Sequence, residues 1–253
     1  MRVLRFRGQS KNFYDAGQDG VLLQEFTSSS GKEPTAETDH RMRSSTFDQE
    51  SRQNVPGVHD QATLTNEISS YLFHYLAGFH IPTHFIEKAS PSAMLVKHLT
   101  MIPLVVQVQN TAMGASARRL GLKEGTELNF PVIEHYYKRP DLGHPLVNEF
   151  HIYARGIATP EQLRVINRLA SKTNIVLRSF FERRGLKLQG LSLEFGMAGD
   201  QIVIGDEISP RTCKLAYGQK RKRTVKTRGA AQLETLVDLH SRLCQPAEGN
   251  VAG

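Results

Sequence analysis

Two acidic side chains lie on opposite arms of one expected hairpin, and together they could hold a metal ion. The alternation of residues 191–208 predicts a hairpin with its turn at residues 197–200. If the turn is centred on residues 199–201, Glu194 lies opposite Asp206 or within one residue of it. Facing carboxylates repel each other, and hard oxygen ligands at this spacing suit a Mg²⁺ ion that carries nucleotide phosphates. An exposed acidic sheet edge without a metal is the alternative.

A glycine and a lysine near the N-terminus could meet a phosphate group. In Arg7-Gly8-Gln9-Ser10-Lys11, the glycine permits close backbone approach at a strand end, and Lys11 supplies a positive charge. Taken alone, the segment is better explained as an ordinary hairpin turn. The sequence holds neither a Walker A loop nor a dinucleotide-binding glycine fingerprint.

The cysteines and histidines form no recognisable site. Two cysteines are too few for a disulfide framework or a cysteine-based zinc site. Cys213 follows Ser209-Pro210, and we expect it to lie in a loop. Surface or core positions are expected for the histidines near the first helix, which are His74, His80 and His84.

The net charge is concentrated in one segment. The 253 residues carry 32 Lys and Arg against 25 Asp and Glu, which gives a formal net charge of +7. Seven basic residues and no acidic ones lie between Lys214 and Arg228, and they account for the whole excess. A positive net charge invites nucleic-acid binding. One short run fits a local anion site or a solvated loop better, so we expect no nucleic-acid partner.

We also expect no membrane association. No apolar run approaches the roughly 18 residues of a membrane span. Arginines interrupt the apolar residues at the N-terminus, so no signal-peptide core is present. With so few cysteines, a reducing cytoplasm is the expected location.

The order of the expected elements favours an α+β fold with antiparallel sheets. Strands come first, at residues 4–6 and 21–26, and residues 27–58 are polar enough to predict a long mobile loop or an insertion. A helix with one apolar face runs from Leu64 to about Gly78. Further strands are expected at residues 84–87, 94–99 and 104–109.

Two more helices are expected in the second half. Thr159, Pro160 and Gln162 have the chemistry of a capping box with proline in the first turn, and that helix should end at Gly185. The last helix has one apolar stripe, made of Leu233, Leu236, Val237, His240, Leu243 and Cys244.

Short motifs along the chain resemble one known family. In order, they are Arg7-Gly8-x-x-Lys11, Gly78-x-x-Ile81-Pro82-Thr83, Leu95-Val96-Lys97-x-Leu99, Arg119-Leu120-Gly121-x-x-Glu124-Gly125-x-Glu127-Leu128, Pro145-Leu146-Val147-Asn148-Glu149, Leu193-Glu194-Phe195-Gly196 and Gly205-Asp206-Glu207-Ile208-Ser209-Pro210. From Leu4 to about Leu243, the chain is similar to the phosphoribosylaminoimidazole-succinocarboxamide synthase (SAICAR synthetase) family. The resemblance implies two α+β lobes with a kinase-like ATP cleft. The β-rich lobe would cover residues 1–100, and the lobe with the metal and acceptor site residues 101–253.

The resemblance also implies an activity and a set of residues. The activity is an ATP- and Mg²⁺-dependent ligation of a carboxylated imidazole nucleotide and aspartate through an acyl phosphate, in purine biosynthesis. Small molecules are the implied partners, and a homo-oligomer is compatible with the resemblance. The implied ATP-binding residues are Gly8, Lys11, Val96, Lys97, Leu99, Glu194 and Asp206. Of these, Lys11, Glu194 and Asp206 are catalytic, and Glu194 and Asp206 hold Mg²⁺. The implied acceptor-binding residues are Gln109, Asn110, Ser116, Arg211 and Lys214.

The chain departs from the family pattern on the acceptor side. Gln109 replaces an arginine, Ala115 a serine, and Gly190-Leu191-Ser192 an Asp-x-Lys motif. After Ser-Pro, Arg211 and Lys214 replace an aspartate and an arginine. One interpretation is an ordinary SAICAR synthetase in which the basic run compensates for the lost arginine. The others are a repurposed ligase for another acid and amine in specialised nucleoside biosynthesis, and a catalytically weak ATP-binding subunit.

Overall fold

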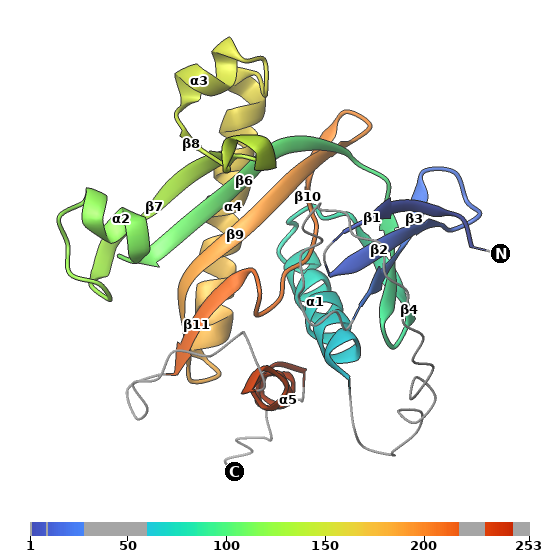
Figure 1. Cartoon of the computed structure of the whole chain (residues 1–253). Helices are drawn as coiled ribbons and strands as arrows, with labels where there is room; N and C mark the ends of the chain where they lie inside the picture. The colour runs from blue at the N-terminus through green and yellow to red at the C-terminus, as the bar shows by residue number, and fades with distance from the viewer. Residues whose placement is uncertain (1, 9, 28–59, 218–230, 245–253) are drawn as a thin grey trace, which may run out of the picture.

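The computed structural model describes residues 2–8, 10–27, 60–217 and 231–244. Residues 28–58 of the expected mobile loop and the basic run from residue 218 onward lie outside the described residues. Two antiparallel sheets and their helices confirm the α+β class (Figure 1). Among the described helices, none combines the length and the apolar character that crossing a membrane requires.

The N-terminal sheet has five antiparallel strands in the order β1-β2-β3-β5-β4. Helix α1 (Gln61–Ala77) packs against three of them, β3, β4 and β5. Leu64, Ile68 and Leu72 on α1 share one hydrophobic core with Met94 and Val96 on β5. Burial of each such side chain contributes about 1.5–3 kcal/mol. The strands are β1 (Leu4–Arg7), β2 (Lys11–Asp15), β3 (Val21–Phe26), β4 (Phe85–Ser90) and β5 (Ala93–Lys97).

The second sheet has six strands in the order β10-β9-β6-β7-β8, and β11 pairs with β9. Helix α4 (Pro160–Glu182) crosses one face of this sheet and contacts β6, β9 and β10 (Figure 1). The strands are β6 (Thr100–Thr111), β7 (Glu127–Tyr137), β8 (Leu146–Val147), β9 (Leu186–Ala198), β10 (Gln201–Gly205) and β11 (Cys213–Tyr217). The other helical elements are α2 (Gly114–Arg119), η1 (Pro140–Leu142), α3 (Glu149–Ala154) and α5 (Ala231–Cys244), of which α5 packs on α1.

The start of α4 follows from its local sequence, as predicted. Thr159 Oγ1 accepts a hydrogen bond from the amide of Gln162, and Gln162 Oε1 accepts one from the amide of Thr159, at 3.2 Å and 2.9 Å. Pro160 is the first helical residue. The helix ends at Glu182, and Gly185 takes up a left-handed conformation just beyond it, with φ of 69°.

The two sheets meet where the chain passes from β5 to β6 through Leu99. A Cβ atom on Gly196 would lie 2.9 Å from Leu99 Cβ, and one on Gly205 would lie 3.0 Å from Leu99 Cδ1. A short parallel bridge between Thr83 and Ile204 joins the sheets at the same place. Glycines in β9 and β10 therefore allow the close approach of the connection between the sheets.

The β9–β10 hairpin is one residue out of register with the expected pairing. The turn consists of Gly199-Asp200 alone, because Ala198 pairs with Gln201. Glu194 consequently lies opposite Gly205, and Asp206 is the next residue. The expected position of Glu194 was opposite Asp206 or within one residue of it, so the observed offset lies within that expectation.

Two other expectations are wrong. Cys213 does not lie in a loop: it is the first residue of β11 and is buried in the core, because the loop after Ser209-Pro210 closes within three residues. In α5, Val237 is 47% exposed, and Leu239 lies in the core instead. The buried side of α5 runs through Leu236, Leu239 and Leu243, which is the spacing of a helix seated on a single neighbour.

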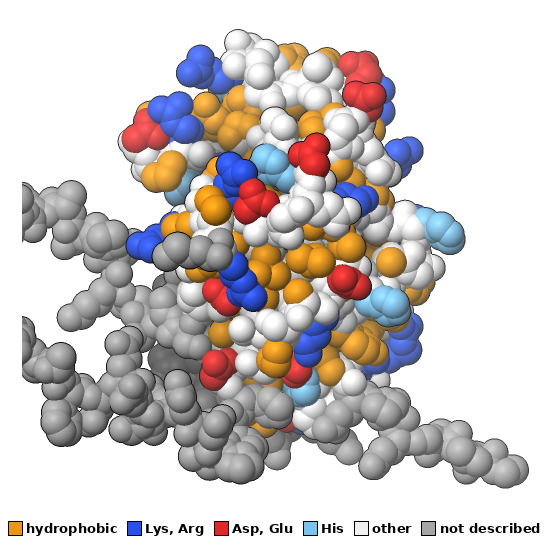
Figure 2. Space-filling model, turned by 90° about the vertical axis from the view of Figure 1, so that its right-hand side faces the viewer, with side chains coloured by type: hydrophobic (Ala, Val, Ile, Leu, Met, Phe, Trp, Pro, Cys, Tyr) orange, Lys and Arg blue, Asp and Glu red, His pale blue; other side chains and the backbone are white. Residues whose placement is uncertain are grey.

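The charge on one face of the described surface is mixed. Figure 2 shows the right-hand side of the molecule, where Lys and Arg side chains alternate with Asp and Glu. This face therefore does not form the single-sign field that attracts a nucleic-acid backbone.

Candidate active site

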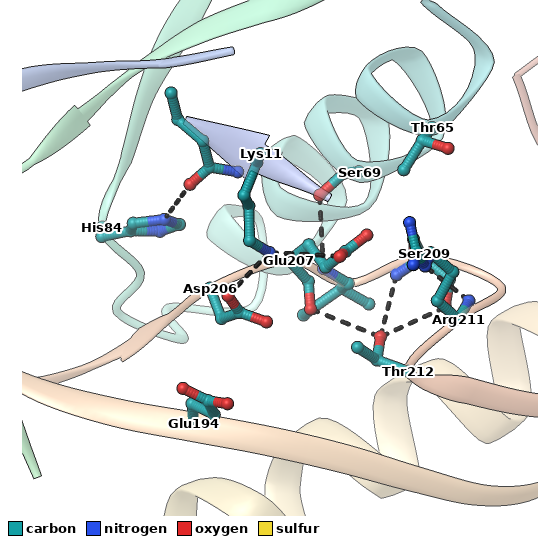
Figure 3. Close-up of polar contacts among 12 residues, drawn as sticks. Lys11, Thr65, Ser69, His84, Glu194, Asp206, Glu207, Ser209, Arg211 and Thr212 are labelled. Carbon is teal, nitrogen blue, oxygen red and sulfur yellow. Dashed lines mark hydrogen bonds and ion pairs between the residues drawn. The ribbon is translucent and has the colours of Figure 1, made fainter. Parts of the chain in front are cut away.

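A buried lysine and two carboxylates meet at the junction of the two sheets (Figure 3). Lys11 Nζ lies 2.6 Å from Asp206 Oδ1 and 3.1 Å from Glu207 Oε1. Lys11 begins β2, whereas Asp206 and Glu207 follow β10, so these ion pairs join distant parts of the chain. The side chain of Lys11 is only 9% exposed. Burying charges is costly even when they are paired, so this cluster is a candidate for function rather than for stability.

A third carboxylate, Glu194, lies beside Asp206 and has its own lysine. The hairpin register places Glu194 next to Asp206, and Figure 3 shows the two carboxylates facing each other. Lys138 Nζ lies 2.5 Å from Glu194 Oε2. The site therefore contains two acid–lysine pairs, Asp206 with Lys11 and Glu194 with Lys138.

The two facing carboxylates differ in acidity. Burial and the charge of Asp206 raise the pKa of Glu194 above its usual range, although Lys138 opposes them. Burial acts in the same direction on Asp206, but the Lys11 ammonium outweighs it and holds the pKa of Asp206 below its usual value. Burial lowers the pKa of Lys11, whereas Glu207 and Asp206 raise it, and the carboxylates prevail. Lys11 and Asp206 are therefore both charged at neutral pH.

Local hydrogen bonds fix the loop that carries Asp206 and Glu207. Asp206 has a φ of 63°, in the left-handed region that aspartate tolerates better than most residues, and this turns the chain out of β10. The amide of Ile208 donates to Ser69 Oγ on α1 at 3.2 Å. Thr212 Oγ1 donates to the carbonyl of Glu207 at 3.3 Å. Both carboxylates are thus held in place before any ligand binds.

The Gly8 segment is a tight hairpin turn beside this cluster. The amide of Gly8 donates to the carbonyl of Lys11 at 2.8 Å, and a Cβ atom on Gly8 would lie 3.0 Å from the same oxygen. The structure therefore places Lys11 at the start of a strand, directly after the turn. Glycine is needed for this close approach.

The segment with Val96, Lys97 and Leu99 connects the two sheets. The side chain of Val96 is buried in the core, so it can face a ligand only through its backbone. The amides of Lys97 and His98 already donate to the carbonyls of His84 and Gly20, at 2.7 Å and 2.8 Å. Within the part of the chain that the structure describes, the amide of Leu99 has no such partner. The amide of Leu99 is therefore available to donate a hydrogen bond to a ligand.

The β register brings Gln109 and Lys214 into one row on the sheet face opposite α4. Each of them pairs with Gly190, from either side. Met113 Cε and Lys214 Cδ lie 3.3 Å and 3.9 Å from the place where a Cβ atom on Gly190 would stand. Because Gly190 has no side chain, Met113 and Lys214 occupy the middle of this row.

The side chain of Gln109 is held in place by a hydrogen bond to Glu134. Gln109 Nε2 donates to Glu134 Oε2 at 3.0 Å, and Tyr136 donates to the same oxygen at 2.8 Å. Arg119 forms an ion pair with the other oxygen of Glu134. Among the described residues, nothing hydrogen-bonds to the buried oxygen of the Gln109 amide.

The other expected acceptor residues lie apart from one another. Ser116 is buried in α2, and its hydroxyl has no partner among the residues described. Asn110 faces α4, where it forms a hydrogen bond of 2.8 Å with Asn174, on the opposite side of the sheet from Gln109. Arg211 is exposed in the loop between β10 and β11, apart from Glu194 in Figure 3.

Three charged residues of the site were not singled out from the sequence. Glu207 stands inside the quoted Gly205–Pro210 motif, so the motif itself was the available signal. Lys138 and its partner Glu194 are 56 residues apart, and no local pattern connects them. Glu134 is likewise identified only through Gln109 and Arg119.

Paired carboxylates and a buried lysine at the junction of two antiparallel sheets are typical of an enzyme that acts on nucleotide phosphates. The SAICAR synthetase family model matches residues 5–229. The phosphoribosylaminoimidazole-succinocarboxamide synthase of Halalkalibacterium halodurans is 38% identical over 213 residues, which cover 84% of this chain and 83% of that protein. The Bacillus subtilis protein of the same name is 34% identical over 241 residues, or 95% and 93% of the two chains. The chain therefore belongs to the SAICAR synthetase family.

Solved structures agree with this assignment over almost the whole chain. The phosphoribosylaminoimidazole-succinocarboxamide synthase of Ehrlichia chaffeensis gives a TM-score of 0.80 at 27% identity, and the match covers 95% of this chain and 98% of that one. A SAICAR synthetase in complex with ADP gives 0.77 at 29% identity, with 94% and 96% covered.

Proposed function

We propose that this protein is an ATP-dependent ligase of purine biosynthesis that joins carboxyaminoimidazole ribotide to aspartate. The observation that carries the proposal is the cluster of Lys11, Asp206, Glu194 and Lys138 in a chain of this family. Its charges are those needed to hold and transfer a phosphoryl group.

Glu194 and Asp206 are the residues that would hold Mg²⁺. Their adjacent carboxylates are hard oxygen donors, and in this structure lysines balance their charge. In the described ranges, no group of three or more His, Cys, Asp or Glu side chains could hold a metal ion. Mg²⁺ commonly binds one or two carboxylates together with nucleotide phosphates, so the donor set fits a metal–nucleotide complex. When bound, Mg²⁺ would neutralise charge on the phosphate oxygens.

The nucleotide would lie between the Gly8 turn and the connection from β5 to β6. The free amide of Leu99 and the backbone of Val96 and Lys97 would contact the base. The Gly8 turn would cover the phosphates. Lys11, which two carboxylates keep charged, would stabilise the phosphoryl group as it is transferred.

The acceptor would bind on the sheet face opposite α4. Its carboxylate attacks the terminal phosphoryl group of ATP, which gives an acyl phosphate and ADP. The amine of the second substrate then displaces phosphate and forms the amide bond. Gln109 and Lys214, which share one row of the sheet, would contact the acceptor, and the Lys214 ammonium would balance its negative charge. The hydroxyl of Ser116 is buried in α2, and Arg211 lies in a separate loop. Asn110 would support this surface by holding α4 to the sheet.

A ligase for a different acid–amine pair is the second candidate. It is favoured by the neutral, locked amide of Gln109 and by Gly190, over which Met113 lies. A site of this shape contacts its acceptor with fewer charges than the family pattern implies.

The activity assay separates these possibilities. The protein is supplied with ATP, Mg²⁺, aspartate and carboxyaminoimidazole ribotide, and ADP and the succinocarboxamide product are measured. Formation of both supports the first proposal. ADP release only with another acid–amine pair selects the second, and nucleotide binding without turnover selects the weak ATP-binding subunit.

We further propose that the two sheets mark two lobes, residues 1–100 and 101–253, and that the protein works in the cytoplasm on small-molecule substrates. The passage from one sheet to the other near Leu99 supports this division. A homo-oligomer remains compatible with the fold, and light scattering at working concentration would measure its size.

A further inference from the structure

Both proposed metal ligands are already paired with a lysine. Lys11 lies against Asp206, and Lys138 lies against Glu194. Two ammonium groups therefore neutralise the carboxylates that a divalent cation would otherwise neutralise. A cation that binds both carboxylates therefore competes with the two ammonium groups, either for the same oxygen atoms or through repulsion of like charges.

The two lysines differ in their freedom to move. The side chain of Lys11 is 9% exposed and keeps Glu207 as a partner when Asp206 is taken away. The side chain of Lys138 is 46% exposed, and among the described residues its one ion pair is with Glu194. The amide of Lys138 donates to the carbonyl of Pro103 at 2.9 Å, so the backbone is fixed while the side chain can turn away.

Lys138 is also placed on the acceptor side of the carboxylates. It directly follows β7, and it reaches across β6 to Glu194 on β9. Val105 on β6 pairs with Tyr136 on one side and with Glu194 on the other, so these residues share one face. By the same register, that face carries Gln109.

We propose that Lys138 binds an anionic oxygen of the reacting substrates after a divalent cation has displaced it from Glu194. The exchange would deliver a positive charge to the reacting centre only when the cation is in place. This inference deepens the proposed function and rests on it. The anionic oxygen would belong to the transferred phosphoryl group or to the acceptor carboxylate, and the experiment distinguishes them.

The exchange predicts effects of opposite sign on two ligands. Without the lysine, Glu194 is free for the cation, so the cation should bind more tightly. The substrate anion loses its partner and should bind more weakly. A residue that only supports the fold would weaken both.

The test uses Lys138→Met and Mn²⁺ as the probe, with free Mn²⁺ measured by electron paramagnetic resonance in the absence of nucleotide. The Kd for Mn²⁺ should fall by about twofold to fivefold, the range for loss of a partly exposed ion pair. With saturating Mg²⁺, the Kd or KM of ATP, or the KM of the acceptor, should rise by about tenfold or more. Lys138→Arg should recover much of this loss. Lys187→Met removes a lysine of similar exposure on β9, whose partner Glu127 is itself exposed, and should change neither quantity.

An unchanged or higher Kd for Mn²⁺ in Lys138→Met would overturn the exchange. Unchanged affinity for both ATP and acceptor would overturn the anion-binding role. A rise for ATP alone assigns Lys138 to the phosphoryl group, and a rise for the acceptor alone assigns it to the carboxylate. If the wild-type protein shows no ligase turnover, the proposed function fails, and Mn²⁺ resonance with ATP calorimetry still tests Lys138.

Discussion

The buried lysine at the centre of the site provides a prediction that separates function from stability. Lys11→Met leaves Glu207 buried with no counter-charge, because Glu207 is 5% exposed and its second oxygen has no partner among the described residues. It also removes the ammonium group that pairs with Asp206. Removing one member of a buried ion pair costs about 3–5 kcal/mol. For a chain of this size, the melting temperature should fall by roughly 6–20 °C.

The double variant Lys11→Met, Glu207→Met should recover part of this loss. It removes the uncompensated charge of Glu207 and replaces both side chains by apolar ones of similar length, a change that is often neutral or stabilising. Asp206 still lacks the lysine that pairs with it, so the recovery is incomplete. Ligase turnover should remain lost in both variants, because the charge at the phosphoryl group is absent. Part of the stability would thus return without activity.

The assay is calorimetric melting in EDTA without nucleotide, so that ligand binding adds nothing to stability. Lys88→Met is the control: its ion pair with Glu67 is exposed and contributes at most about 1 kcal/mol. The reasoning is refuted if Lys11→Met melts no lower than Lys88→Met. It is also refuted if the double variant is as unstable as the single one.

Two further variants test the junction of the sheets and the packing of α4 on the second sheet. Gly196→Ala puts a Cβ atom 2.9 Å from Leu99 Cβ, so calorimetry should show roughly tenfold weaker ATP binding. Gly78→Ala is the control and should bind ATP normally, because its Cβ atom would make only ordinary van der Waals contacts. Equal ATP affinity in the two would place Leu99 outside the nucleotide site. Asn174→Ala removes a hydrogen-bond partner of the buried Asn110 amide and should lower the free energy of unfolding by about 2–3 kcal/mol. The melting temperature should therefore fall by about 4–12 °C. A fall of less than about 2 °C would contradict this prediction.

The elements best predicted from the sequence are those fixed by local chemistry. Thr159, Pro160 and Gln162 specify the start of α4 through their own side chains, and the structure forms the same bonds. Strand β7 was missed, because Pro131 interrupts it. That proline falls where the pairing with β6 shifts register, so the lost amide hydrogen bond costs little there.

The carboxylate pair shows how much of the site could be predicted from the sequence. Glu194 and Asp206 are neighbours, as predicted, although the shorter turn shifts the pairing by one residue. A shift of one residue would normally send a side chain to the other face. The left-handed conformation of Asp206, just past the end of β10, nevertheless leaves its carboxylate facing Glu194.

The lysine partners could not be found in the same way. Lys138 meets Glu194 only because β6 lies between β7 and β9, and strand order is a property of the whole sheet. The pairing of Lys11 with Glu207 likewise depends on how the two sheets meet. On the acceptor side, the sequence grouped Gln109 with Asn110, but successive residues of a strand face opposite ways.

The Mg²⁺ dependence of nucleotide binding tests the central claim most directly, and titration calorimetry with ADP measures it. The wild-type protein should bind ADP at least about tenfold more tightly with Mg²⁺ than with EDTA, and Asp206→Asn should lose that difference. Equal affinity with and without Mg²⁺ in the wild type, or a full Mg²⁺ effect in Asp206→Asn, would contradict the assignment of Asp206 and Glu194 as the metal–nucleotide site.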